Sequence, residues 1–165
     1  MTDPADIRDD PLIIRFRGEY DYDGLLSLIR GFYKRSLFDI KEPKLKYKVG
    51  GTGAEVEFKF ESDRKITHYI KAYLFVEGHF WDVKKEKTGL TKGKLDIRIS
   101  SQMELDYAGK FDGKKPSHKW MQEKLDEKGT GLQFGDNKVT GEKYLEKLMD
   151  KLQTEIKKHL KMECV

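Results

Sequence analysis

Residues 94–107 read KLDIRISSQMELDY and alternate apolar with polar side chains more regularly than any other stretch of the chain. A period of two predicts a β-strand with one buried and one solvated face. The side chains expected to point inward are Leu95, Ile97, Ile99, Met103, Leu105 and Tyr107. The same rhythm begins at residue 44, so we expect an antiparallel meander over 44–107 whose apolar face must be covered.

Residues 44–61 predict the first hairpin of this meander. Lysines take alternate positions in 44–48, and acidic residues take most of the alternate positions in 55–61. The glycines between them favour a tight turn. A phosphate-binding loop would need a helix behind its glycines, and here a strand follows. The lysines of one strand should therefore face the glutamates of the other and help to set the register.

Residues 66–83 form the longest predicted strand, and its two faces differ. One face is almost wholly apolar, while the other carries a row of aromatic side chains: Tyr69, Tyr73, Phe75 and Trp81. A straight strand of this length would span about 60 Å, so we expect a bend or bulge near Gly78. A contiguous row of exposed aromatic side chains is unfavourable in water. We therefore expect residues 110–134 or another protein chain to cover it.

Two amphipathic helices complete the predicted fold. After a half-buried strand at 12–20, the apolar residues of 25–37 share one half of a helix that Asp21 or Asp23 can cap. A second helix over 140–160 also keeps its apolar side chains on one half. The order strand, helix, antiparallel meander and long C-terminal helix is that of an α+β protein, with the sheet packed on helices.

The chain has the length of one domain, which we expect at 12–161. Residues 1–11 are rich in aspartate and predict a flexible acidic tail. Residues 109–140 are rich in glycine and lysine and predict a loop-rich segment that can hold a short helix. Of the 165 residues, 37% are hydrophobic, which is enough for a core.

Composition narrows the class of protein. The net charge of +4 is only mildly basic, so nucleic-acid binding is a weaker alternative. The single cysteine, Cys164, excludes an internal disulfide and a four-thiolate zinc site. No stretch approaches the roughly 20 apolar residues of a membrane span, and we expect no secretory signal and a cytoplasmic location. Abundant lysine and glutamate with one asparagine follow the trend of thermophile proteins.

No catalytic signature stands out, so we expect a noncatalytic protein without a cofactor. His68 and His79 are eleven positions apart and would face opposite sides of a regular strand, so they cannot share a metal ion. His118 and His159 have no carboxylate or cysteine at ligand spacing. The histidines therefore predict no metal site.

The element order resembles the helix-grip fold of the START and birch-pollen-allergen superfamily, in which a curved antiparallel sheet grips the last helix. The resemblance implies a cavity between the sheet and the C-terminal helix that holds apolar ligands. The chain departs from that fold in having five or six predicted strands, where the superfamily usually has seven. A cystatin-like sheet wrapped around one helix fits residues 12–107 nearly as well.

Two binding functions follow from this arrangement. The first is binding of an apolar or amphipathic small molecule between the sheet and the C-terminal helix. Its candidate pocket residues are Tyr20, Phe32, His68, Phe80, Met103 and Met149. The second is a protein-interaction or homo-oligomeric assembly module. Its candidate interface residues are Tyr69, Tyr73, Phe75 and Trp81.

Overall fold

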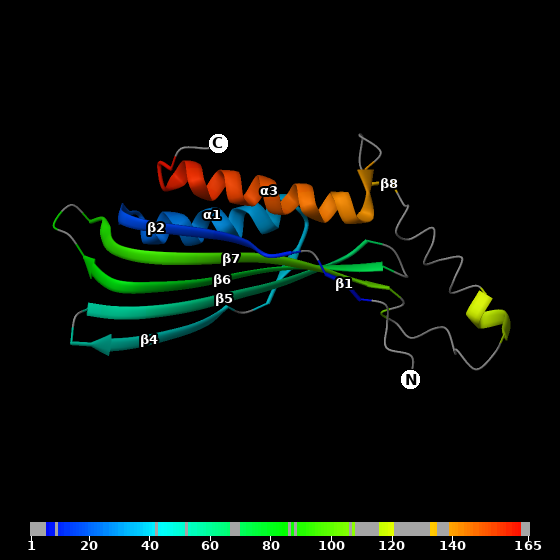
Figure 1. Ribbon diagram of the computed structural model, residues 1–165, viewed down its shortest axis with the longest axis horizontal. Helices are drawn as coiled ribbons and strands as arrows, with labels where there is room; N and C mark the ends of the chain where they lie inside the picture. The colour runs from blue at the N-terminus through cyan, green and yellow to red at the C-terminus, as the bar shows by residue number, and fades with distance from the viewer. Residues whose placement is uncertain are drawn as a thin grey trace.

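The computed structural model describes residues 6–8, 10–41, 43–51, 53–66, 70–85, 87, 89–105, 107, 116–120, 133–134 and 139–162. Within these ranges a long antiparallel sheet forms one layer and two helices form the other (Figure 1). The helices are α1 (Tyr22–Arg35) and α3 (Gly141–His159). The predicted α+β class and the order of its long elements are confirmed.

The described part of the sheet contains seven strands, all paired antiparallel. They are β1 (Asp6–Arg8), β2 (Leu12–Tyr20), β3 (Asp39–Ile40), β4 (Lys44–Gly50), β5 (Gly53–Lys65), β6 (Ile70–Lys85) and β7 (Thr91–Leu105). Strands β5, β6 and β7 form the central meander, β4 and β3 both pair with β5, and β2 and β1 both pair with β7. A separate two-stranded sheet joins β8 (Gln133–Phe134) to β9 (Val139–Thr140), and residues 116–120 are helical.

The sequence predicted a flexible tail over residues 1–11, but residues 6–8 form a strand. They form β1, which places Ile7 opposite Met103 on β7. Strand β2 pairs with β7 only as far as Ile99, so the edge of β7 beyond that point offers free backbone hydrogen-bonding groups. Strand β1 uses them, which is why a segment too short to show a period is still a strand.

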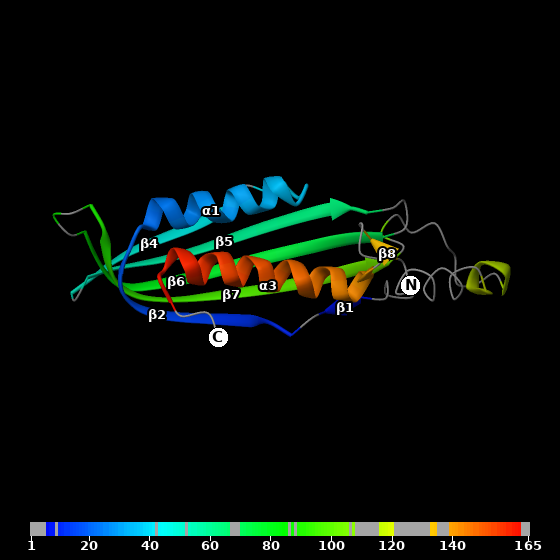
Figure 2. The ribbon, with the colours of Figure 1, turned by 90° about the horizontal axis from the view of Figure 1, so that it is seen from above.

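Both helices cover the same face of the sheet (Figure 1) and lie side by side on it (Figure 2). The predicted cap is confirmed, because the Gly24 N–H donates to Asp21 Oδ1 at 3.1 Å. Leu25 and Ile29 of α1 and Leu152 and Ile156 of α3 are wholly buried. Burial of these apolar stripes against the sheet is the main favourable contribution to folding.

The irregularity in β6 lies at Asp82 and not at Gly78, where we had expected it. Gly78 pairs regularly with its neighbours, whereas the register shifts between Trp81 and Lys84, and Asp82 has φ of +54°. A bulge reverses the alternation of side chains beyond it. Unbroken alternation from Trp81 would place Val83 on the outer face, but beyond the bulge Val83 pairs with Ala54 and packs against the core.

Gly78 is needed for packing rather than for backbone bending. A Cβ atom added to Gly78 would lie 2.0 Å from Cε1 of Phe58. The Phe58 ring is 2% exposed and is held between Phe60 and Phe80, with centroid distances of 5.4 and 5.3 Å. We expect Gly78→Ala to lower the free energy of unfolding by about 1–3 kcal/mol, because the ring must leave its place. Urea denaturation measures this loss.

Gly31 provides the matched control for this substitution. It lies in α1, and a Cβ added there would meet no atom within 4 Å. Gly31→Ala should raise stability by about 0.5–1 kcal/mol, because alanine loses less backbone entropy in a helix. Similar losses in both variants would contradict the packing role of Gly78.

Candidate functional site

Five of the six predicted pocket residues belong to the hydrophobic core. They are Tyr20, Phe32, Phe80, Met103 and Met149, each at most 4% exposed. The rings of Tyr20 and Phe80 stack with their centroids 5.7 Å apart. None of the five lines either of the two pockets described below. His68 lies outside the described residues, and a ligand cavity under α3 stays a prediction.

A pocket of about 450 Å³ opens beside the start of α1, and we call it the end pocket. Its apolar lining combines the start of α1 with β4, β5 and β6: Tyr22, Leu45, Tyr47, Ala54, Val56 and Val83. Its remaining lining is Asp21, Asp23, Lys46, Gly89 and Thr91. Leu45 lies opposite Phe58 and Tyr47 lies opposite Val56, so β4 presents these side chains on the core face of the sheet.

The end pocket exposes large apolar side chains. Leu45 is 55% exposed and Tyr47 is 67% exposed, although their partners across β5 are buried. The position of β4 in the sheet explains this contrast. In the described sheet β4 pairs only with β5, so its core-face side chains have a neighbouring strand on one side alone. Strand β5 lies between β4 and β6, which flank Val56 and Phe58 on both sides.

Charge at the end pocket is unevenly distributed. Asp21 and Asp23 lie at the start of α1, where negative charge is favourable. Asp23 has no ion-pair partner among the described residues, and Lys46 is the one basic residue in the lining. Burial, followed by the charge of Asp23, raises the pKa of Tyr22, so its phenol is neutral and able to form hydrogen bonds at neutral pH.

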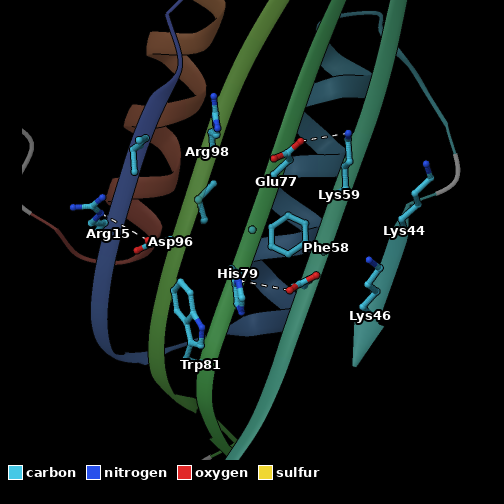
Figure 3. Close-up of a pocket in the computed structure, with 14 residues that line it drawn as sticks. Arg15, Lys44, Lys46, Phe58, Lys59, Glu77, His79, Trp81, Asp96 and Arg98 are labelled. Atoms are coloured by element: carbon cyan, nitrogen blue, oxygen red, sulfur yellow. Dashed lines mark ion pairs between the residues drawn. The ribbon is translucent and has the colours of Figure 1, made fainter. Parts of the chain in front are cut away.

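A second hollow of about 500 Å³ lies over the other face of the sheet, and we call it the outer groove (Figure 3). Its side chains come from five strands, and they include Ile13, Arg15, Lys44, Lys46, Glu57, Lys59, Glu77, His79, Trp81, Asp96 and Arg98. Strand register puts five of them in one row across the sheet: Lys46, Glu57, His79, Asp96 and Arg15. Alternating charge along such a row stabilises the register.

Ion pairs between residues of the outer groove are drawn as dashed lines in Figure 3. Arg15 Nε lies 3.7 Å from Asp96 Oδ2, and Lys59 Nζ lies 3.4 Å from Glu77 Oε1. Arg98 has no ion-pair partner within the described part of the chain. Its register partner on β6 is Glu77, which pairs with Lys59.

Three members of the aromatic row, Tyr73, Phe75 and Trp81, lie on the outer face, as predicted. Tyr73 and Phe75 stack with centroids 6.0 Å apart, and the Tyr73 hydroxyl donates to Glu104 Oε2 at 2.6 Å. Trp81 stacks on His79 at 3.9 Å. These contacts leave the three aromatic side chains half-buried. Tyr69 and most of 110–134 lie outside the described residues, so a protein interface here stays a prediction.

A cluster of metal-ligating side chains on this face was not found from the sequence. One carboxylate oxygen each of Glu55 and Glu57 and one ring nitrogen of His79 lie within 4.8 Å of one another. Spacing along the chain, from which the sequence predicted no metal site, carries no information on the neighbouring strand. Glutamates two positions apart share a strand face, and this spacing was the available signal. The missing information was the register of β5 against β6.

Neither a protein-family model nor a curated protein matches the sequence. In the described ranges no helix is both long and apolar enough to cross a membrane.

Proposed function

We propose that the protein binds an amphipathic small molecule, with an apolar body and a cationic end, in the end pocket. The observation that carries this proposal is the exposure of Leu45 and Tyr47 inside a concave site. Covering apolar surface gains about 25 cal/mol per Å². The volume of about 450 Å³ falls within the range of small-molecule sites. The ligand class follows the sequence prediction, but the proposed site moves from α3 to the start of α1.

The charges of the lining support a cationic end. Two carboxylates, Asp21 and Asp23, line the pocket together with one basic residue, Lys46, whose side chain β4 presents on the outer face of the sheet. Asp21 already accepts a hydrogen bond from the Gly24 N–H, whereas Asp23 has no ion-pair partner among the described residues. A primary amine could donate charge-assisted hydrogen bonds to Asp23, and these are stronger than bonds between neutral groups.

Three ligands of equal chain length test the proposal. Decylamine, decanol and decanoic acid share one apolar body and differ only in the head group. We expect decylamine to bind about tenfold more tightly than decanol, a difference of about 1.4 kcal/mol, and decanoic acid to bind most weakly. Isothermal titration calorimetry below the micellar concentration measures the three affinities. Absence of binding by all three ligands would refute the proposal.

Substitutions in β4 locate the ligand. Leu45→Ser with Tyr47→Ser should weaken decylamine binding at least tenfold, because burying a large apolar side chain is worth about 1.5–3 kcal/mol. Val49→Ser is the matched control. Val49 is 79% exposed on the same face of β4 but does not line the pocket, so its loss should leave the affinity unchanged.

Asp23→Asn should weaken decylamine binding and leave the affinity for decanol unchanged. Equal losses in the control and the double variant would contradict this site.

A further inference from the structure

We propose that Glu55, Glu57 and His79 form a binding site for a divalent transition-metal ion on the outer face of the sheet. Their three donor atoms lie within 4.8 Å of one another. Imidazole and carboxylate together suit Zn²⁺ and related ions. Metal–ligand distances of about 2.0–2.2 Å place neighbouring donors of a tetrahedral ion about 3.4 Å apart. Small side-chain rotations would therefore complete the site.

The backbone explains why these three side chains converge. Glu57 and His79 are direct partners across β5 and β6. On a regular ladder Glu55 would face Trp81, but the register shifts between Ala54 and Val56. His79 Nε2 consequently forms a hydrogen bond with Glu55, and His79 Nδ1 lies 3.8 Å from Glu57 Oε1. Bulges beside functional sites commonly re-aim a side chain in this way.

Neighbouring groups hold His79 in place. Its ring stacks on Trp81 with an interplanar angle of 17°, which fixes the plane of the imidazole. A metal ion bound at Nε2 would share Glu55 as its nearest carboxylate ligand. Glu57, which lies two positions from Glu55 on the same face of β5, would then supply the third ligand. Ligands carried on paired strands are more precisely placed than ligands carried on loops.

The charge around the cluster also favours a dication. Glu55 and Glu57 carry two negative charges, whereas Asp96, the register partner of His79 on β7, already forms an ion pair with Arg15. On β4, the register partners of Glu57 and Glu55 are Lys46 and Lys48. Lysine side chains are long and flexible, so their ammonium groups can move away when an ion binds. With three protein ligands, the ion would keep an open coordination position, which water from the outer groove would fill.

Metal titration of the full chain tests this site without any assumption about the end pocket. The protein would carry Cys164→Ser to remove its thiol. We expect one Zn²⁺ per chain by calorimetry, with an affinity at least tenfold weaker in Glu55→Gln, Glu57→Gln and His79→Gln. Glu77→Gln is the matched control, because Glu77 shares the outer face of β6 but pairs with Lys59. Its affinity for Zn²⁺ should equal that of the parent protein.

A second measurement does not depend on the folding of any ligand variant. Co²⁺ or Ni²⁺ bound at His79 should quench the fluorescence of Trp81, because the two rings stack at 3.9 Å. The quenching should follow the same binding curve as the calorimetry and should disappear in Trp81→Phe, in which Trp120 remains. The proposal is overturned by the absence of saturable binding, by unchanged affinity in His79→Gln, or by quenching that survives in Trp81→Phe.

Discussion

Raising the pH from about 10 to about 12 should remove about 5 kcal/mol of stability, because burial makes two tyrosines harder to ionise in the folded protein than in the unfolded chain. Tyr33 is wholly buried and Tyr20 is 3% exposed, and burial raises the pKa of both phenols well above the usual value of about 10. In the unfolded chain each phenol releases its proton near pH 10. The unfolded state then binds fewer protons than the folded state, so stability falls as pH rises.

The pH window follows from these shifts. The contribution of each tyrosine is fully present below about pH 10 and is lost as pH rises toward its folded pKa. The expected slope is about 1.4 kcal/mol per pH unit for each group, or about 2.7 for the pair. A total stability of about 5–15 kcal/mol is typical of a protein domain. Urea denaturation at a series of pH values should therefore show a steep alkaline loss.

The double variant Tyr20→Phe with Tyr33→Phe isolates this effect. The stabilisation contributed by other groups also falls above pH 10. One of them is Lys59, whose pKa is raised by its hydrogen bond to Glu61. The difference in slope between the two proteins removes such contributions. A double variant whose alkaline slope equals that of the parent would show that the tyrosines are not responsible.

The two hydroxyls should differ at neutral pH. The Tyr20 hydroxyl has no hydrogen-bond partner in the described part of the chain, so Tyr20→Phe should leave stability unchanged or raise it. The Tyr33 hydroxyl donates to the Leu74 carbonyl at 3.3 Å, so Tyr33→Phe should lower stability by about 1 kcal/mol.

Phe80→Ala should lower the free energy of unfolding by about 3–5 kcal/mol. The Phe80 side chain is wholly buried, and the rings of Tyr20, Tyr22 and Phe58 lie within 5.7 Å of it. Removing the ring takes away its own burial and leaves a cavity that three large neighbours cannot fill. Urea denaturation at neutral pH measures the loss.

Phe75→Ala is the matched control on the same strand. Phe75 points to the outer face, is half-buried and stacks on Tyr73. We expect its removal to cost about 1 kcal/mol, the scale of a cross-strand or aromatic pair. Equal losses at Phe75 and Phe80 would contradict the assignment of the two faces of β6.

The long strands and helices were predictable from the sequence because one face of each is buried. A slip of one residue in β7 would place Ile97 and Ile99 in water, so the alternation determines which face is inside. The bounds of β2 matched the prediction because Asp21 caps the helix that follows. Strands β1 and β3 have three and two residues and are too short to show a period. They depend on partners far away in the sequence.

The candidate sites were less predictable because they depend on distances between elements. Alternation in β4 indicated that Leu45 and Tyr47 face the core side, and they do, but it carries no information on whether strands flank them on both sides. The bulge at Asp82 was assigned to Gly78 because glycine commonly marks irregular strands. Here the glycine makes room for Phe58 instead.

The pairing of β2 with β7 has a consequence for synthesis of the chain. Leu12 and Tyr20 of β2 lie opposite Ile99 and Thr91 of β7. Strand β2 therefore cannot pair until β7 has been synthesised. As the chain leaves the ribosome, β2 and α1 have no sheet edge to join until β7 has emerged. Contacts this distant in sequence slow folding, and an early strand without a partner is prone to aggregate. A nascent chain arrested before residue 91 should therefore be more sensitive to protease than one arrested after α3.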